Sequence, residues 1–117
     1  VIIDFGLSKF YKTNNKHIEN TKISNIIGNH NFISKNIHNL EQPSRRDDVI
    51  SSFYILIYLL IGKDNERSFC GFKITDEYIK NQVLNFDINN IILFHSNIYK
   101  LSFYQKPQYN LLLSLIN

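Results

Sequence analysis

Hydrophobic residues are densest in the middle of the chain, where nearly every position from 49 to 61 is apolar. Gly62 follows this run and is a typical helix stop, and the polar residues that continue to position 68 predict a turn. A helix that is apolar on nearly all sides has to pack inside a domain. The pattern therefore predicts a central, buried helix that ends before Gly62.

The residues ahead of this run carry the signals of a helix start. Pro43 and Ser44 interrupt the preceding segment, and the Ser44 hydroxyl can accept a hydrogen bond from a free backbone N–H of the first turn. Asp47 lies three residues later as a capping-box partner, and Asp47 and Asp48 both complement the positive N-terminal end of a helix. We therefore place the central helix at residues 44–61.

Apolar residues at helical spacing indicate three further helices. The first covers residues 76–86. Asp87 can cap the second, whose apolar face would consist of Ile88, Ile91, Ile92, His95 and Tyr99. Lys106-Pro107 begins the third, because a proline in the first turn loses no hydrogen bond there. Its apolar face would consist of Leu111, Leu112, Leu115 and Ile116.

The N-terminal third of the chain is less regular. Val1–Ile3 is a β-branched run that leads into Asp4-Phe5-Gly6, which predicts a buried strand ending in a glycine turn. Residues 9–31 are rich in Asn, Lys, Thr and Ser and show no sustained period. We expect a long loop there, with one short strand over residues 22–27.

Composition narrows the class of protein. The 117 residues are 44% hydrophobic, which is too apolar for a disordered chain and fits one domain or part of one. The longest apolar run, residues 53–61, is roughly half of what a bilayer needs, so we expect no membrane span. The formal net charge is only +3 and Arg45-Arg46 is the only basic doublet, so we expect no nucleic-acid partner. A single cysteine, Cys70, excludes a disulfide scaffold and fits an intracellular protein, cytoplasmic or nuclear.

Asp4-Phe5-Gly6 is the first chemical signal. A carboxylate at a strand end, followed by glycine, can coordinate a hard cation such as Mg²⁺. In protein kinases a D-F-G sequence does this for the metal that bridges the ATP phosphates. Taken alone, the tripeptide favours an ordinary turn at a strand end, so the other motifs have to decide.

Several separated motifs together resemble the casein kinase 1 family of serine/threonine protein kinases, which includes the vaccinia-related kinases. The N-terminal motif reads I-D-F-G-L, and His17-Ile18 follows in the loop. A G-x-x-x-[YF]-x-S stretch covers residues 28–34, and S-R-R-D-D covers residues 44–48. Residues 100–109 are similar to the family's S-L-x-F-x-x-K-P-D-Y segment, whereas residues 63–97 align poorly.

The resemblance implies an α+β protein kinase-like fold, of which this chain is the mainly α-helical large lobe from the D-F-G strand onward. It implies transfer of the ATP γ-phosphoryl group to Ser or Thr of a protein substrate, with ATP and Mg²⁺ as cofactors of the parent protein. Asp4 would be a metal ligand, and Asp4, Phe5 and Gly6 would lie at the cofactor site. The implied partners are the protein substrate and an N-terminal kinase lobe.

The resemblance also divides the chain into segments with separate roles. Residues 1–6 form the D-F-G strand, 7–43 the activation segment and substrate loop, 44–61 the central helix and 62–117 the C-terminal helices. The candidate substrate-loop residues are Gly28, Asn31 and Ser34. The candidate structural anchors are Arg46 and Asp48, since Asp48 matches the central-helix Asp that holds the backbone of the catalytic loop by hydrogen bonds.

Departures from the family pattern leave two other hypotheses open. The sequence has no Gly-rich loop, no strand Lys and no H-R-D-type catalytic loop, so no catalytic base is expected within these residues. Asn31 stands where the family has an Arg of an anion site, and Phe53 stands where it has a small residue. The alternatives are a pseudokinase remnant that acts as a protein-binding module and an unrelated small helical domain. We also expect poor solubility, because Val1–Ile3 and the start of the central helix would lack their usual cover.

Overall fold

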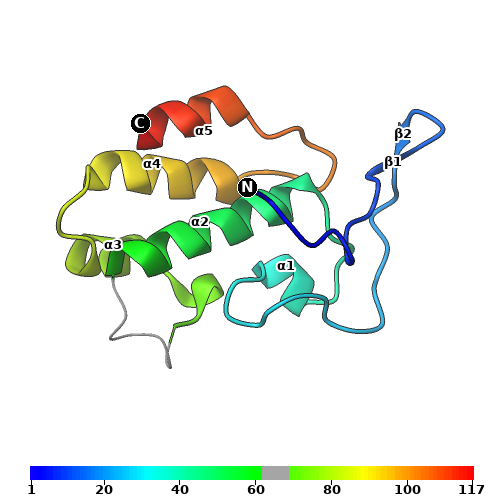
Figure 1. Ribbon diagram of the computed structural model, residues 1–117, viewed down its shortest axis with the longest axis horizontal. Coiled ribbons are helices and arrows are strands. Elements are labelled where there is room, and N and C mark those ends of the chain that lie inside the picture. Colours follow the sequence, from blue (N-terminus) through cyan, green and yellow to red (C-terminus); the bar gives the residue numbers. More distant parts are fainter. Residues whose placement is uncertain (62–68) are drawn as a thin grey trace.

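Helix α2 (Arg45–Ile61) is the longest element and lies in the middle of the molecule (Figure 1). The computed structural model describes residues 1–61 and 69–117, so the turn predicted over residues 62–68 lies outside the described residues. Helix α4 (Ile88–Tyr99) packs along α2, and α5 (Tyr109–Ile116) packs on the outer side of α4. The prediction of a mainly helical chain is confirmed.

Shorter helical elements complete the domain. Helix α1 (Lys35–His38) and the 3₁₀ helix η2 (Gly71–Lys73) lie on the side of α2 opposite to α4 (Figure 1). Helix α3 (Asp76–Gln82) packs against α4 and is shorter than predicted, since the backbone at Val83 is already extended. The starts of α3 and α4 are both capped by side chains, since Thr75 accepts a hydrogen bond from the N–H of Tyr78 and Asp87 accepts one from the N–H of Asn90. The Asp87 cap was predicted.

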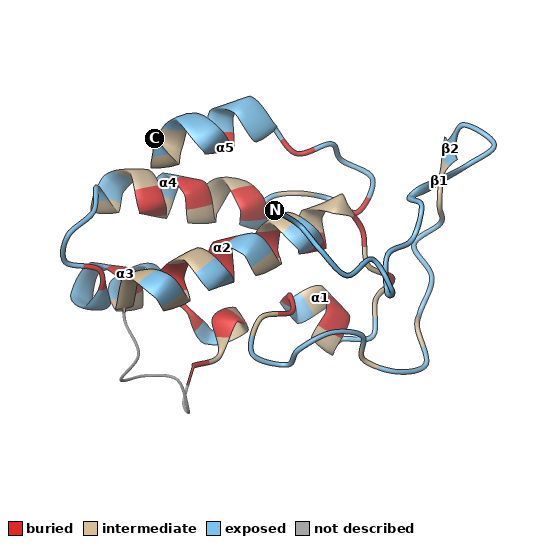
Figure 2. Ribbon diagram, in the orientation of Figure 1, coloured by how far each residue is buried: buried red, intermediate tan, exposed pale blue. Residues whose placement is uncertain are grey.

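The core forms where α2 meets α4 (Figure 2). Phe53 stacks on Phe94, and the hydroxyls of Tyr54 and Tyr99 share a hydrogen bond. On the other side of α2, the backbone of η2 comes so close that a Cβ built on Gly71 would lie 2.2 Å from Cδ2 of Tyr54. Only glycine allows this approach, and it lets a backbone segment pack directly on an aromatic ring.

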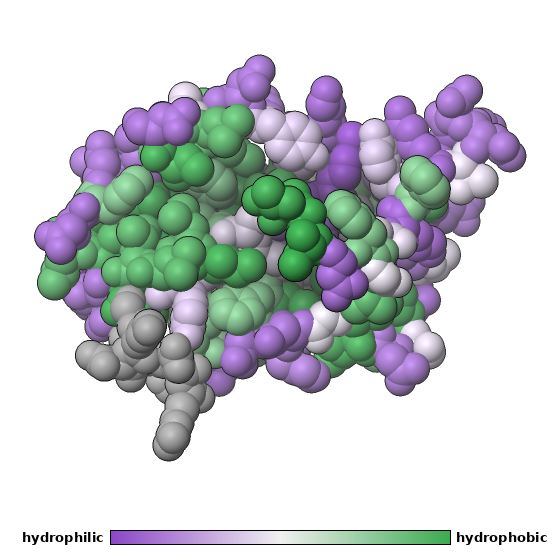
Figure 3. Space-filling model, viewed as in Figure 1, coloured by the Kyte–Doolittle hydropathy of each residue, from purple (hydrophilic) through white to green (hydrophobic). Residues whose placement is uncertain are grey.

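Burial around α2 is incomplete, which corrects the prediction of a helix buried on all sides. Asp48, Ser52, Ile55 and Leu59 form an exposed stripe at helical spacing. In Figure 3, hydrophobic surface gathers over α2 and α4, whereas the end with the hairpin is mostly hydrophilic. The stripe is exposed because, among the described elements, none packs on that side of the helix.

The buried faces of the last two helices also differ in detail from the sequence pattern. On α4 the buried residues are Ile91, Phe94 and Ile98, so the face is rotated away from the predicted Tyr99, which is exposed. On α5 only Leu112 is fully buried. Both helices are so rich in apolar residues that spacing alone did not decide which side would meet the core.

The predicted strand at Val1–Ile3 is wrong, because these residues are exposed and have no strand conformation. A strand needs a neighbour to pair its backbone groups, and no segment of the described chain pairs with this one. The predicted strand over residues 22–27 is reduced to one bridge between Lys22 and Glu41.

A small hairpin was missed by the sequence patterns. It consists of β1 (Lys12–Thr13) and β2 (Lys16–His17), which pair antiparallel. The two turn residues between the strands, Asn14 and Asn15, both have positive φ, as tight two-residue hairpin turns require. The His17 ring packs edge-on against Phe103 in the segment before α5, which fixes the hairpin to the body. No helix in the described part of the chain is long and apolar enough to cross a membrane.

The asymmetry of α2 gives a stability prediction. Ile57 is fully buried, whereas Leu59, two residues later, is 69% exposed. Replacement Ile57→Ala should lower the free energy of unfolding by about 2–5 kcal/mol. The matched control Leu59→Ala should change it by about 0.5 kcal/mol or less. Urea unfolding followed by circular dichroism measures both, and equal losses in the two variants would contradict this packing.

Candidate functional site

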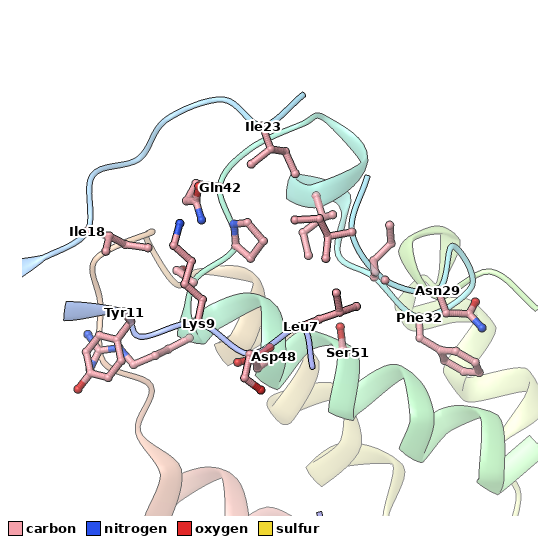
Figure 4. Close-up of a pocket in the computed structure, with 18 of the residues that line it drawn as sticks. Leu7, Lys9, Tyr11, Ile18, Ile23, Asn29, Phe32, Gln42, Asp48 and Ser51 are labelled. Atoms are coloured by element: carbon pink, nitrogen blue, oxygen red, sulfur yellow. The ribbon is translucent and has the colours of Figure 1, made fainter. Parts of the chain in front are cut away.

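A pocket with a volume of about 630 Å³ opens between the N-terminal segment, residues 18–33 and the start of α2 (Figure 4). Charged residues from both sides line it, with Lys9 on the N-terminal segment and Asp48 on α2. Its apolar wall includes Ile18, Ile23 and Phe32. The pocket therefore combines an apolar wall with a few charged groups, as ligand and peptide sites do.

Asp4 contributes to this pocket from a tight turn. Its φ is 61°, and its Oδ1 accepts a hydrogen bond of 3.2 Å from the N–H of Gly6. The carboxylate is exposed and keeps lone pairs free for a cation. The neighbouring Phe5 is 67% exposed and does not reach the core. The D-F-G residues thus form a local turn at the rim of the pocket.

Asp48 lies at the start of α2 with its side chain at the same pocket. The Ser52 hydroxyl donates to the Asp48 backbone carbonyl, and no hydrogen bond to the carboxylate is seen within the described residues. Desolvation by the surrounding protein, and then repulsion from the Asp47 carboxylate, raise the pKa of Asp48 above its usual value. The exposed Asp48 carboxylate can therefore accept hydrogen bonds from a molecule that enters the pocket.

Asp47, directly before it, has the opposite environment and was not singled out as a site residue. Its side chain is 1% exposed. Oδ1 accepts hydrogen bonds from Ser34 Oγ at 2.5 Å and Asn36 Nδ2 at 3.0 Å, and Oδ2 accepts one from the Ser44 N–H at 2.8 Å. The last bond is the capping-box contact predicted from the sequence. The sequence signal for the rest was only the S-R-R-D-D pair of carboxylates.

Arg46 connects three segments of the chain. Its Nη2 lies 2.8 Å from Glu41 Oε2, its Nε lies 3.7 Å from Asp47 Oδ2, and its Nη1 donates to the carbonyl of Leu101 at 3.5 Å. The side chain is only 11% exposed, so these contacts are shielded from water. Arg46 thereby ties the start of α2 to the segment that leads into α5.

Residues 28–34, for which the resemblance predicts a substrate loop, present the three candidate residues differently. Gly28 has a φ of 104° and lines the pocket, and Asn31 is exposed, with its carbonyl accepting the Gly71 N–H at 2.9 Å. Ser34 is fully buried, and its hydroxyl donates to Asp47 and accepts from the N–H of Ile37. Ser34 therefore cannot touch a bound molecule and serves the loop from inside.

The pocket therefore brings together Asp4, Gly28 and Asp48, whereas Phe5, Ser34 and Arg46 do not line it. Across residues 1–61 and 69–117, no group of three or more His, Cys, Asp or Glu side chains could hold a metal ion by itself. No protein-family model matches this chain.

The raised pKa of Asp48 gives a pH prediction. A carboxyl whose folded-state pKa exceeds its unfolded value costs stability while it is charged, and this cost disappears once pH falls below about 3.9, where both states are protonated. Replacement Asp48→Asn should therefore raise the melting temperature at pH 7 and leave it unchanged at pH 3.

Asp87→Asn is the control, since it makes the same charge change at another helix start and asparagine caps about as well as aspartate. Melting curves by circular dichroism at the two pH values test the pair. A lower melting temperature for Asp48→Asn at pH 7, or an equal gain at both pH values, would refute the assignment.

Proposed function

We propose that the chain is the C-terminal part of a serine/threonine protein kinase domain of the casein kinase 1 type, where it forms the helical large lobe from D-F-G onward. The observation that carries this proposal is the shared pocket, because Asp4 of D-F-G and Asp48 of S-R-R-D-D line one cavity. The order of the motifs along the sequence supports it independently.

The parent protein would transfer the γ-phosphoryl group of ATP to a Ser or Thr hydroxyl of a protein. In such reactions the protein mainly positions the reactants and stabilises charge. Asp4 fits the role of one Mg²⁺ ligand, since its carboxylate is exposed and only one of its oxygens accepts a bond from Gly6. Mg²⁺ sites of kinases use one or two carboxylates together with phosphate oxygens, and the bound ion neutralises charge on those phosphates.

The surroundings of Asp48 support the same proposal. In the family, this Asp holds the backbone of the catalytic loop, and here its carboxylate faces the pocket without a donor in the described chain. The exposed stripe of α2, with Ile55 and Leu59, continues from Asp48. In a kinase domain, further segments would cover this stripe and supply the base and the second metal ligand, which these 117 residues do not contain.

A pseudokinase remnant that binds a protein is the second candidate. The observation that favours it is Phe53, which fills the position of a small family residue and is fully accommodated in the core against Phe94 and His95. The two candidates differ in the coding sequence ahead of Val1. An intact Gly-rich loop, strand Lys and catalytic Asp-x-x-x-x-Asn there favour the enzyme, and their absence favours the remnant.

The test is a phosphoryl-transfer assay with radiolabelled ATP and a Ser/Thr-containing protein. The full gene product that includes this chain should transfer phosphate only with Mg²⁺, and Asp4→Asn should reduce the rate by about 100-fold or more. Asp87→Asn should leave the rate unchanged, because that residue caps α4 outside the pocket.

The 117 residues alone should show no transfer above background. Transfer by the isolated 117 residues, or an active gene product that is indifferent to Asp4→Asn, would overturn the proposal. An inactive gene product that lacks the upstream motifs would select the pseudokinase alternative.

A further inference from the structure

The two adjacent carboxylates at the start of α2 have different surroundings, since Asp47 is bound by other segments and Asp48 faces the pocket. We propose that Asp47 is the residue that positions the substrate loop, and that Asp48 is left free for whatever enters the pocket. That residues 28–34 receive a substrate rests on the proposed function, whereas their positioning by Asp47 does not.

The Asp47 carboxylate contacts several segments of the chain at once. The two oxygens of Asp47 face different segments, since Oδ1 accepts from Ser34 Oγ and Asn36 Nδ2 while Oδ2 accepts from the Ser44 N–H. The carboxylate therefore bridges the end of the substrate loop, α1 and the start of α2. The 2.5 Å bond to Ser34 is in the range of strong, charge-assisted hydrogen bonds.

The hydrogen bond between Ser34 and Asp47 is buried. Ser34 is fully buried and Asp47 nearly so, which means that water cannot replace either partner. Loss of one partner would remove a buried hydrogen bond that water cannot replace, which costs more than loss of an exposed contact. The Ser34 hydroxyl also accepts from the N–H of Ile37, so the same oxygen joins the loop, the N-cap of α1 and the central helix.

Backbone hydrogen bonds and packing connect Ser34 to the exposed part of the loop. The N–H groups of Phe32 and Ile33 both donate to the carbonyl of Asn29, at 2.9 and 3.0 Å, so the loop is closed on itself. Ile33 is buried, and its Cγ2 lies so close to Gly28 that a Cβ at that position would be only 2.7 Å away. Fixing Ser34 therefore fixes residues 28–33 as one unit at the wall of the pocket.

Asp48 has none of these connections. It is exposed at the pocket, and within the described part of the chain its carboxylate bonds to no loop residue. Successive residues on a helix point about 100° apart, which sends one carboxylate inward and the next outward. The pair thus separates support of the loop from contact with the pocket.

Hydrogen exchange of backbone amides in the 117-residue chain, followed by NMR, tests the assignment. The readouts are the amides of Phe32 and Ile33, with Ile91 in α4 as an internal reference. Asp47→Asn should speed exchange at the two loop amides by about tenfold or more relative to Ile91, because the loop loses its charged anchor. Asp48→Asn and the control Asp87→Asn should leave that ratio unchanged.

Ser34→Ala keeps the test decisive if Asp47→Asn unfolds the whole chain, since it leaves the bonds of Asp47 to Asn36 and Ser44 in place and removes only the Ser34 hydroxyl, with its bonds to Asp47 and Ile37. It should also speed loop exchange, and the effect of the double variant Ser34→Ala/Asp47→Asn should be smaller than the product of the two single effects, because both changes break the same bond between Ser34 and Asp47. Loop amides as protected as in the parent chain in these variants, or equal opening by Asp48→Asn, would overturn the proposal.

A kinetic readout applies to the full gene product. Asp47→Asn should raise KM for a peptide substrate about tenfold or more and leave KM for ATP unchanged, which a merely structural defect would not do. An equal rise in KM for the peptide and in KM for ATP would contradict substrate positioning. A parent protein without transfer activity would refute the proposed function, and the exchange experiment would then decide the role of Asp47 on its own.

Discussion

Burial of one side of α2 is the constraint on which the rest of the structure depends. The helix is too apolar to lie on a surface, so α4 covers one flank and η2 the other. Each cover is specific, with aromatic stacking between Phe53 and Phe94 on one flank and the glycine approach to Tyr54 on the other. Other helices are placed relative to this core, because α3 and α5 pack on α4 and α1 joins the polar start of α2.

The same helix changes character at its first turn, and this change creates the site. Downstream residues bury hydrocarbon, whereas the first turn carries Arg46, Asp47 and Asp48. Arg46 and Asp47 turn inward and find partners among neighbouring segments, so their charges act as internal fasteners. Asp48 turns outward and has its pKa raised by desolvation and by Asp47, which marks it as a group kept at some cost to stability.

The sequence predicted those parts of the fold that depend on local signals. Helix existence followed from spacing and caps, as at Asp87, where the predicted cap bonds to the N–H of Asn90. The errors lie where distant partners decide: Val1–Ile3 has strand propensity but no strand beside it in the described chain, and the hairpin has strands of only two residues. The site was predicted as far as its motifs, but the inward side chain could not be chosen between Asp47 and Asp48. That choice depends on the rotation of α2, which its packing against α4 sets.

The contact between Gly71 and Tyr54 limits which sequences this fold can accept. Any side chain at position 71 would overlap the ring at position 54, whatever its polarity. The two positions are therefore expected to vary together among related chains, with a smaller residue at 54 wherever 71 is not glycine. This expected covariation links positions 54 and 71, which are distant in the sequence, and it arises only from the space that their side chains occupy. It offers a way to recognise distant relatives of this chain whose charged motifs have been lost.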